Sequence, residues 1–303
     1  IERMGDFMDN DADFYGIYAS CNAIEGHTFD AYWMLLRDGV DIVDVPGDNL
    51  WEDLLGLDDY GTTNLHTVGL RAAGAFGAFD YDAEVAYQFG SADVVGTTFK
   101  PALYGDDDAK FDNLGAKLDA GYRFDCKFTP RVYIGARYYG GEDNRDLSFW
   151  ESINPFHTPE ASVSFNRLFS NDITSGFFDH TKDLSNAYVL RAGVGAALTE
   201  KILADLCVSY FHTVDAFDRP FMPWALISPA ITKENDGDLG TEVHLFAEYH
   251  YSQDLTFEAG WAHLFTGDGL KQGSFIRGNG LIFAGGTDDD DADYVYSGCK
   301  VKF

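Results

Sequence analysis

Apolar and polar side chains alternate along about eleven segments of the chain, each about ten residues long. The segments are residues 12–22, 28–37, 65–77, 79–90, 113–124, 130–139, 186–198, 201–212, 240–251, 254–265 and 292–303. Successive side chains of a β-strand point to opposite faces, and a tilted strand of about nine to eleven residues crosses a bilayer. The pattern therefore predicts an all-β fold, a transmembrane antiparallel β-barrel with about eleven strands in this chain.

The final predicted strand, 292–303, combines this alternation with a terminal phenylalanine. Its apolar face carries Val295, Cys299, Val301 and Phe303, and its other face carries Lys300 and Lys302. Such an ending is typical of outer-membrane β-barrel proteins. We therefore expect a position in the bacterial outer membrane, in contact with its lipid, and we expect Phe303 to be the signal for the barrel-assembly machinery.

The connections between the predicted strands alternate in length. Short links at 77–80, 126–130, 199–200 and 251–254 alternate with long ones at 38–64, 91–112, 140–185, 213–239 and 266–291. Short turns are periplasmic and long loops external in outer-membrane barrels, so the C-terminus is expected in the periplasm. Single-chain bacterial barrels have an even strand number. We therefore expect residues 1–303 to be a single barrel domain whose N-terminal strands precede residue 1.

Composition agrees with a membrane barrel and excludes other classes of protein. Aromatic residues make up 16% of the chain, with 17 Tyr and 25 Phe, as the interface girdles of a barrel require. No apolar run is long enough for a spanning helix. The formal charge of −29 argues against nucleic acid as a partner. The four cysteines are scattered without a metal or haem spacing.

Several short stretches resemble the alginate-export family of outer-membrane barrels. They are Phe165–Asp179 (FNRLFSNDITSGFFD), Tyr210–Thr213 (YFHT), His66–Arg71 (HTVGLR) with Tyr81–Gly90 (YDAEVAYQFG), and Ala136–Asp143 (ARYYGGED). The resemblance implies eighteen antiparallel strands around a monomeric, anion-selective pore for a polyuronate. Eleven strands here would then be the C-terminal part of the barrel. A place in a larger complex is left open.

The alternation assigns charged side chains to the lumen. The predicted pore-lining residues are Arg71, Lys117, Arg123, Arg131, Arg137, Arg191, Lys300, Glu84, Asp119 and Glu248, and Lys302, Asp82, Asp205, Glu242 and Glu258 share their face. Guanidinium groups can bind successive carboxylates of an acidic polysaccharide, while neighbouring acids keep each site weak enough to release it. The alternative is a salt-bridge network that fills the lumen. Basic residues concentrate on strands 65–77, 113–139, 186–198 and 292–303, whereas strands 201–212 and 240–265 carry mostly acids, which suggests opposed charged walls.

Other candidate chemistry is weaker. His244 and His250 share a face with Glu242 and Glu248, a spacing that suits a polar lumen, a metal site or a pH-sensitive constriction. Acidic tips at 106–108 and 288–291 suit Ca²⁺ or simply a solvated loop. No catalytic or phosphate-loop motif appears, so we expect no enzyme and no resident cofactor.

Two functions remain open from the sequence. One is a passive porin or export channel for anionic solutes. The other is a scaffold barrel whose lumen is plugged by its own loops or occupied by a partner protein, such as an electron-transfer subunit. The aromatic connection 140–185 either folds inward as a constriction or lies on a partner.

Overall fold

The computed structural model describes most of the strand-forming part of the chain and parts of its long connections. The described residues are 12–38, 42–43, 62–92, 94–95, 109–141, 161–162, 164–167, 175–178, 184–216, 218–221, 231–234, 236–272 and 291–302. Phe303 and the acidic tips 106–108 and 288–290 lie outside this set, so the predictions made for them stay predictions.

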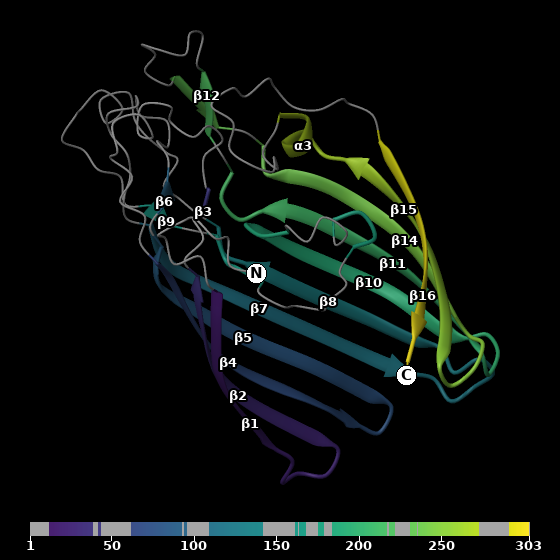
Figure 1. The fold of residues 1–303 in the computed structure, drawn as a ribbon. Helices are drawn as coiled ribbons and strands as arrows, with labels where there is room; N and C mark the ends of the chain where they lie inside the picture. The colour runs from purple at the N-terminus through teal and green to yellow at the C-terminus, as the bar shows by residue number, and fades with distance from the viewer. Residues whose placement is uncertain are drawn as a thin grey trace.

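One antiparallel sheet contains all eleven predicted strands in chain order (Figure 1). The strands are β1 (Ala12–Cys21), β2 (His27–Asp38), β4 (Thr63–Phe76), β5 (Phe79–Ala92), β7 (Ala109–Arg123), β8 (Arg131–Tyr139), β10 (Ala187–Ala197), β11 (Ile202–Thr213), β14 (Asp238–His250), β15 (Leu255–Thr266) and β16 (Ala292–Val301). Each strand pairs with its neighbours in sequence, as hairpins of a membrane barrel do. The predicted fold class is confirmed.

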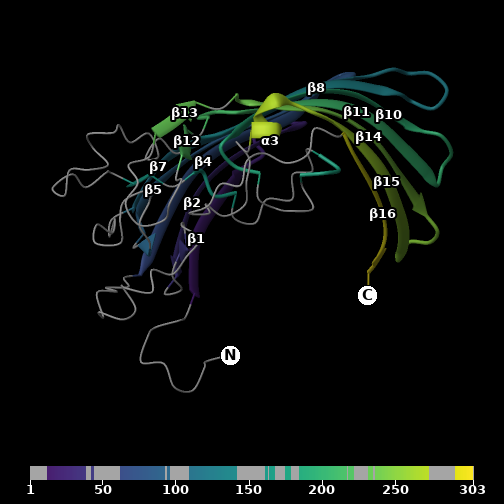
Figure 2. The ribbon, with the colours of Figure 1, turned by 90° about the horizontal axis from the view of Figure 1, so that it is seen from above.

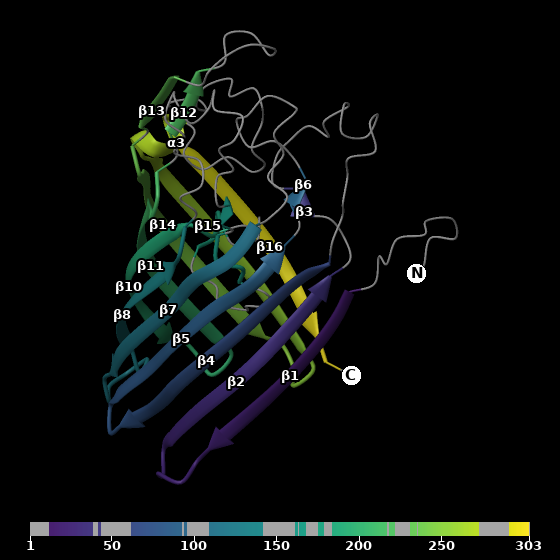
Figure 3. The ribbon, with the colours of Figure 1, turned by 90° about the vertical axis from the view of Figure 1, so that its left-hand side faces the viewer.

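The sheet bends into an open trough. In Figure 2 it forms an arc that leads from β1 at one edge, through β8, to β16 at the other edge. Figure 3 shows β1 to β7 on the near side of the trough and β14 to β16 on the far side. We call the concave side the inner face and the convex side the outer face. The total of eighteen strands and the single-domain assignment stay predictions.

The two faces differ sharply in character. The outer face carries large apolar side chains in the open, among them Leu70 (61% exposed), Ile134 (65%) and Val295 (74%). Such a surface is suited to lipid. The inner face carries polar, charged and small side chains that are buried or half-buried. Because the side-chain period of a strand is two residues, one register fixes this separation along every strand.

Short and long connections lie at opposite ends of the strands, as predicted (Figure 1). The long connections hold small elements that the alternation did not predict. These are the parallel pair β3 (Ile42–Val43) and β6 (Val94–Val95), the bridge β9 (Ala161–Ser162) to β7, the hairpin of β12 (Asp218–Phe221) and β13 (Ile231–Glu234), and the helix α3 (Asp268–Gln272). Among the described residues, no helix has the length and apolarity needed to cross a membrane.

The apolar core lies on the inner face, near the long connections. Val189 and Phe211 of the wall are fully buried against Phe178 and Leu184, which belong to the connection between β8 and β10. Tyr139 and Phe165 extend the same cluster toward β7. This part of the inner face is therefore packed rather than open.

Candidate pore lining of the inner face

The register places every predicted pore-lining residue on the inner face. Arg71 lies opposite Glu84, Glu84 opposite Lys117, and Lys117 opposite Arg137. Asp119 and Arg191 lie on either side of Gly135, and Arg123 lies opposite Arg131. On the other edge, Glu248 lies opposite Glu258, and Lys300 lies opposite Thr256, two residues away along β15. Their role in lining a pore stays a prediction.

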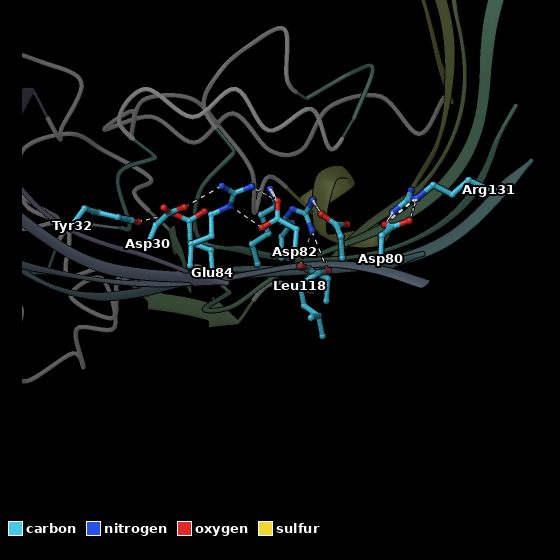
Figure 4. Close-up of polar contacts among 12 residues, drawn as sticks. Asp30, Tyr32, Asp80, Asp82, Glu84, Leu118 and Arg131 are labelled. Atoms are coloured by element: carbon cyan, nitrogen blue, oxygen red, sulfur yellow. Dashed lines mark hydrogen bonds and ion pairs between the residues drawn. The ribbon is translucent and has the colours of Figure 1, made fainter. Parts of the chain in front are cut away.

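Arg71 is the centre of an ion-pair network on β2, β4, β5 and β7, whose acids Asp30 and Asp82 are labelled in Figure 4. Its Nε donates to Asp82 Oδ1 at 2.8 Å, and its Nη1 lies 3.3 Å from Asp30 Oδ2. Lys117 Nζ reaches the same Asp82 at 3.2 Å. Next to this network, the Tyr32 hydroxyl donates to Glu84 Oε1 at 2.6 Å. Two cations therefore pair with two carboxylates, and a third carboxylate, Glu84, lies beside them.

Two arginines of β8 also form ion pairs, one with an acid of β5 and one with an acid of β7. Arg131 donates from Nε to Asp80 Oδ2 at 2.9 Å and forms a second bond from Nη2 to the other carboxylate oxygen. Arg137 donates to Asp119 at 2.6 Å and to the Ala136 carbonyl at 2.9 Å. The Arg137 side chain is only 1% exposed, so it is the most deeply buried of these paired cations.

A tyrosine lies beside two of the predicted cations. The guanidinium carbons of Arg131 and Arg191 each lie 5.1 Å from the centre of the Tyr133 ring. The Tyr133 hydroxyl donates to Asp205 Oδ1 at 2.7 Å, which connects β8 to β11. Such cation–π contacts hold a guanidinium in place while leaving its edge available for hydrogen bonds.

The strands β14, β15 and β16 have their own ion pairs and histidine contacts. Lys300 lies 2.6 Å from Glu258 and 3.5 Å from Glu248. The two histidines have separate partners: His244 Nε2 lies 2.9 Å from the Tyr296 hydroxyl, and His250 Nδ1 lies 3.0 Å from Thr256 Oγ1. In the described part of the chain, no three His, Cys, Asp or Glu side chains gather as a metal site. The histidine contacts fit the polar-lumen alternative.

The prediction of opposed charged walls is wrong. The acids Asp80, Asp82 and Glu84 all lie on β5, between the cations of β4 and β7, so positive and negative groups are interleaved on one wall. The inner set predicted from the sequence lacks Asp30, Tyr32 and Asp80. All three lie inside the predicted strands 28–37 and 79–90, so the same alternation would have assigned them to the inner face.

The connection between β8 and β10 folds onto the inner face. Its residues 164–167 contact β5 and β7, and its residues 175–178 contact β11 and β14. The sequence left two alternatives open for this connection, and the described residues take the inward one. The aromatic content of the segment was the signal, but it did not identify the strands that receive it.

Comparison with solved structures gives outer-membrane β-barrels, all at low similarity. The ferric enterobactin receptor of Pseudomonas aeruginosa is 11% identical, with a TM-score of 0.47, over 86% of this chain and 34% of the receptor. The siderophore receptor PiuA of Acinetobacter baumannii is 15% identical, with a TM-score of 0.44, over 98% of this chain and 49% of PiuA. The toluene transporter TodX of Pseudomonas putida is 12% identical, with a TM-score of 0.38, over 83% of this chain and 72% of TodX. This chain thus spans about a third of the enterobactin receptor's length.

The family comparison is more decisive. No curated protein matches the sequence. The model of the alginate export family, however, matches residues 2–279, which is most of the chain. Together with the lipid-suited outer face, this match indicates a wall of a barrel in the bacterial outer membrane. The chain belongs to the alginate export family.

Proposed function

We propose that this chain forms part of the wall of a passive outer-membrane channel for anionic solutes, with an acidic polysaccharide such as alginate as the candidate solute. The observation that carries the proposal is the set of cationic side chains on β4, β7, β8 and β10 of the inner face, with the acids of β5 between those of β4 and β7. The long connections would face the cell exterior and the C-terminus the periplasm.

Partial exposure of the ion pairs gives this wall its proposed mechanism. The side chains of Arg71 and Arg131 are 34% and 28% exposed, and each is paired with a carboxylate of the wall. A solute carboxylate would compete for the same guanidinium, with a similar bidentate geometry. Because the wall acid re-forms its pair when the solute leaves, each site binds weakly enough for passage.

Replacing Arg71 and Arg131 together with glutamine tests the proposal. The double variant leaves Asp80 and Asp82 in place without two of their cations, so the wall becomes more negative. In the full-length protein reconstituted in planar bilayers, the reversal potential in a KCl gradient should move toward cation selectivity. Block of the current by oligouronates should weaken in the same variant.

A matched control is Lys201→Gln. Lys201 is exposed in the short turn between β10 and β11, away from the ion pairs, so its loss should leave the reversal potential nearly unchanged. If the double variant has the wild-type reversal potential, the inner-face cations do not select the solute and the proposal fails.

The plugged barrel is a second candidate function, because part of the inner face is packed by the chain's own connection. Phe178 of that connection is buried against Phe211 of the wall. A reconstituted full-length protein that conducts no ions in any variant, and that co-purifies with a partner, would favour this scaffold function over the channel.

A further inference from the structure

A buried glutamate of the wall binds the inward connection. Glu242 on β14 has no exposed surface. Its carboxylate accepts hydrogen bonds from Ser175 Oγ at 2.6 Å, from the Gly176 backbone N–H at 2.8 Å and from the Phe177 backbone N–H at 2.9 Å. A carboxylate buried without such donors would be strongly unfavourable. The bonds therefore tie residues 175–177 to the wall.

The short segment is shaped for this position. Ser175 Oγ also accepts from the backbone N–H groups of Phe177 and Phe178, at 3.0 and 2.8 Å, which folds the segment into a turn. At Gly176, an added Cβ would lie 2.8 Å from the Ala262 Cβ and from His244 Cδ2. Only glycine allows the backbone to approach β14 and β15 this closely.

A second anchor lies on the opposite part of the trough. Gln88 of β5 donates from Nε2 to the Asn166 carbonyl at 2.7 Å and accepts from the Asn166 backbone N–H at 2.7 Å. Gln88 has no exposed surface. The adjacent Phe165 ring packs over Gly115, where a Cβ would collide with the ring, and beside Tyr139. This reciprocal pair of bonds to one residue is a specific attachment.

The two anchors are far apart in the sheet. Gln88 belongs to β5 and Glu242 to β14, and the order β5-β7-β8-β10-β11-β14 separates them by five strand positions. At about 4.8 Å per position, the separation along the arc is about 24 Å. One connection therefore contacts two distant parts of the inner face and occupies space that a solute would need.

We propose that residues 164–167 and 175–178 form a fixed constriction inside the channel, and that Glu242 is the positioning residue that sets its width. This inference rests on the proposed channel and adds what limits the size of the solute. The charged groups of β4 to β8 would select by charge, whereas the Glu242 attachment would select by size.

Two variants test the attachment in the full-length protein in planar bilayers. Glu242→Gln replaces one acceptor oxygen with an NH₂ group, which then faces the N–H or O–H donors of the segment. Ser175→Ala removes the hydroxyl that donates to Glu242 and accepts from the backbone N–H groups of the turn. Each should raise the single-channel conductance by about twofold and admit larger neutral polymers, since a pore's conductance follows its narrowest section. Glu242→Gln should have the larger effect, because it removes the charge that strengthens all three bonds between Glu242 and the segment, whereas Ser175→Ala leaves the two backbone N–H bonds to Glu242 in place.

Glu200→Gln is the matched control, since Glu200 is exposed in the short turn after β10. It should conduct like the wild type. Resistance of each folded variant to SDS reports whether the barrel is intact; Ser175→Ala keeps the test available if Glu242→Gln does not fold. Unchanged or lower conductance in an intact variant would overturn the constriction. The size cut-off for neutral polymers does not depend on charge, and Ser175→Ala changes no charge. If Ser175→Ala and Glu242→Gln raise the conductance while the Arg71 and Arg131 double variant keeps the wild-type ion selectivity, only the proposed anion preference fails.

Discussion

The two halves of the trough have the same strand pattern but differ in what covers their inner face. On β4 to β8, several inner side chains form ion pairs that remain partly open, such as Arg71 with Asp82, and the described residues of the connection cover this half only near Gln88. On β10 to β15, Val189, Phe211 and Glu242 are fully buried beneath the chain's own connection. The alternation fixes which face a side chain occupies. Whether that face is open depends on a loop.

The difference also separates two kinds of energetic contribution. A half-exposed ion pair contributes little to folding, at most about 1 kcal/mol, because water screens it and its side chains lose freedom. A buried aromatic contact removes apolar surface from water and contributes several times more. The packed half is therefore expected to hold the inward connection in place, and the open half to remain available to a solute.

Phe211→Ala should have the largest effect on this comparison. Phe211 is fully buried, and its ring centre lies 4.8 Å from that of Phe178. Truncation should leave a cavity and lower the free energy of unfolding by about 3 kcal/mol, measured by chemical denaturation in lipid or detergent. The inward connection should also loosen, so conductance should rise.

Phe257→Ala provides the contrast on the same sheet. Phe257 points to the outer face and is 45% exposed, so its loss creates no internal cavity. We expect a smaller loss of stability and the wild-type conductance. Equal losses in the two variants would mean that the inner face of β10 to β15 is not a packed core.

Much of this wall could be predicted from the sequence because strand alternation is a local property. The inner positions of Arg71, Lys117 and Lys300 follow from a two-residue period, and the register then preserves them. The burial of Glu242 could not be predicted in this way. Its partner Ser175 lies 67 residues earlier, so the contact depends on how a long connection folds back. The interleaving of cations with the β5 acids likewise depends on strand order.

Asp80→Asn should have an intermediate effect, confined to the open half. Arg131 would lose the charge of its bidentate partner, although both side chains are about 30% exposed. The expected loss of stability is about 1 kcal/mol. The inner face would gain net positive charge, so the reversal potential in a KCl gradient should move toward anions. Asp254→Asn, in the exposed short turn between β14 and β15, is the control and should move it much less.

Arg123→Gln should have the smallest effect on stability. Arg123 lies on the inner face opposite Arg131, is exposed, and has no ion pair among the described residues. A change at such a site should alter the free energy of unfolding by less than about 0.5 kcal/mol. Arg123 nevertheless adds positive charge to the inner face. Its removal should therefore shift the reversal potential modestly toward cation selectivity, without any change in stability. A loss of stability comparable to that of Asp80→Asn would mean that Arg123 is part of the ion-pair network of the open half.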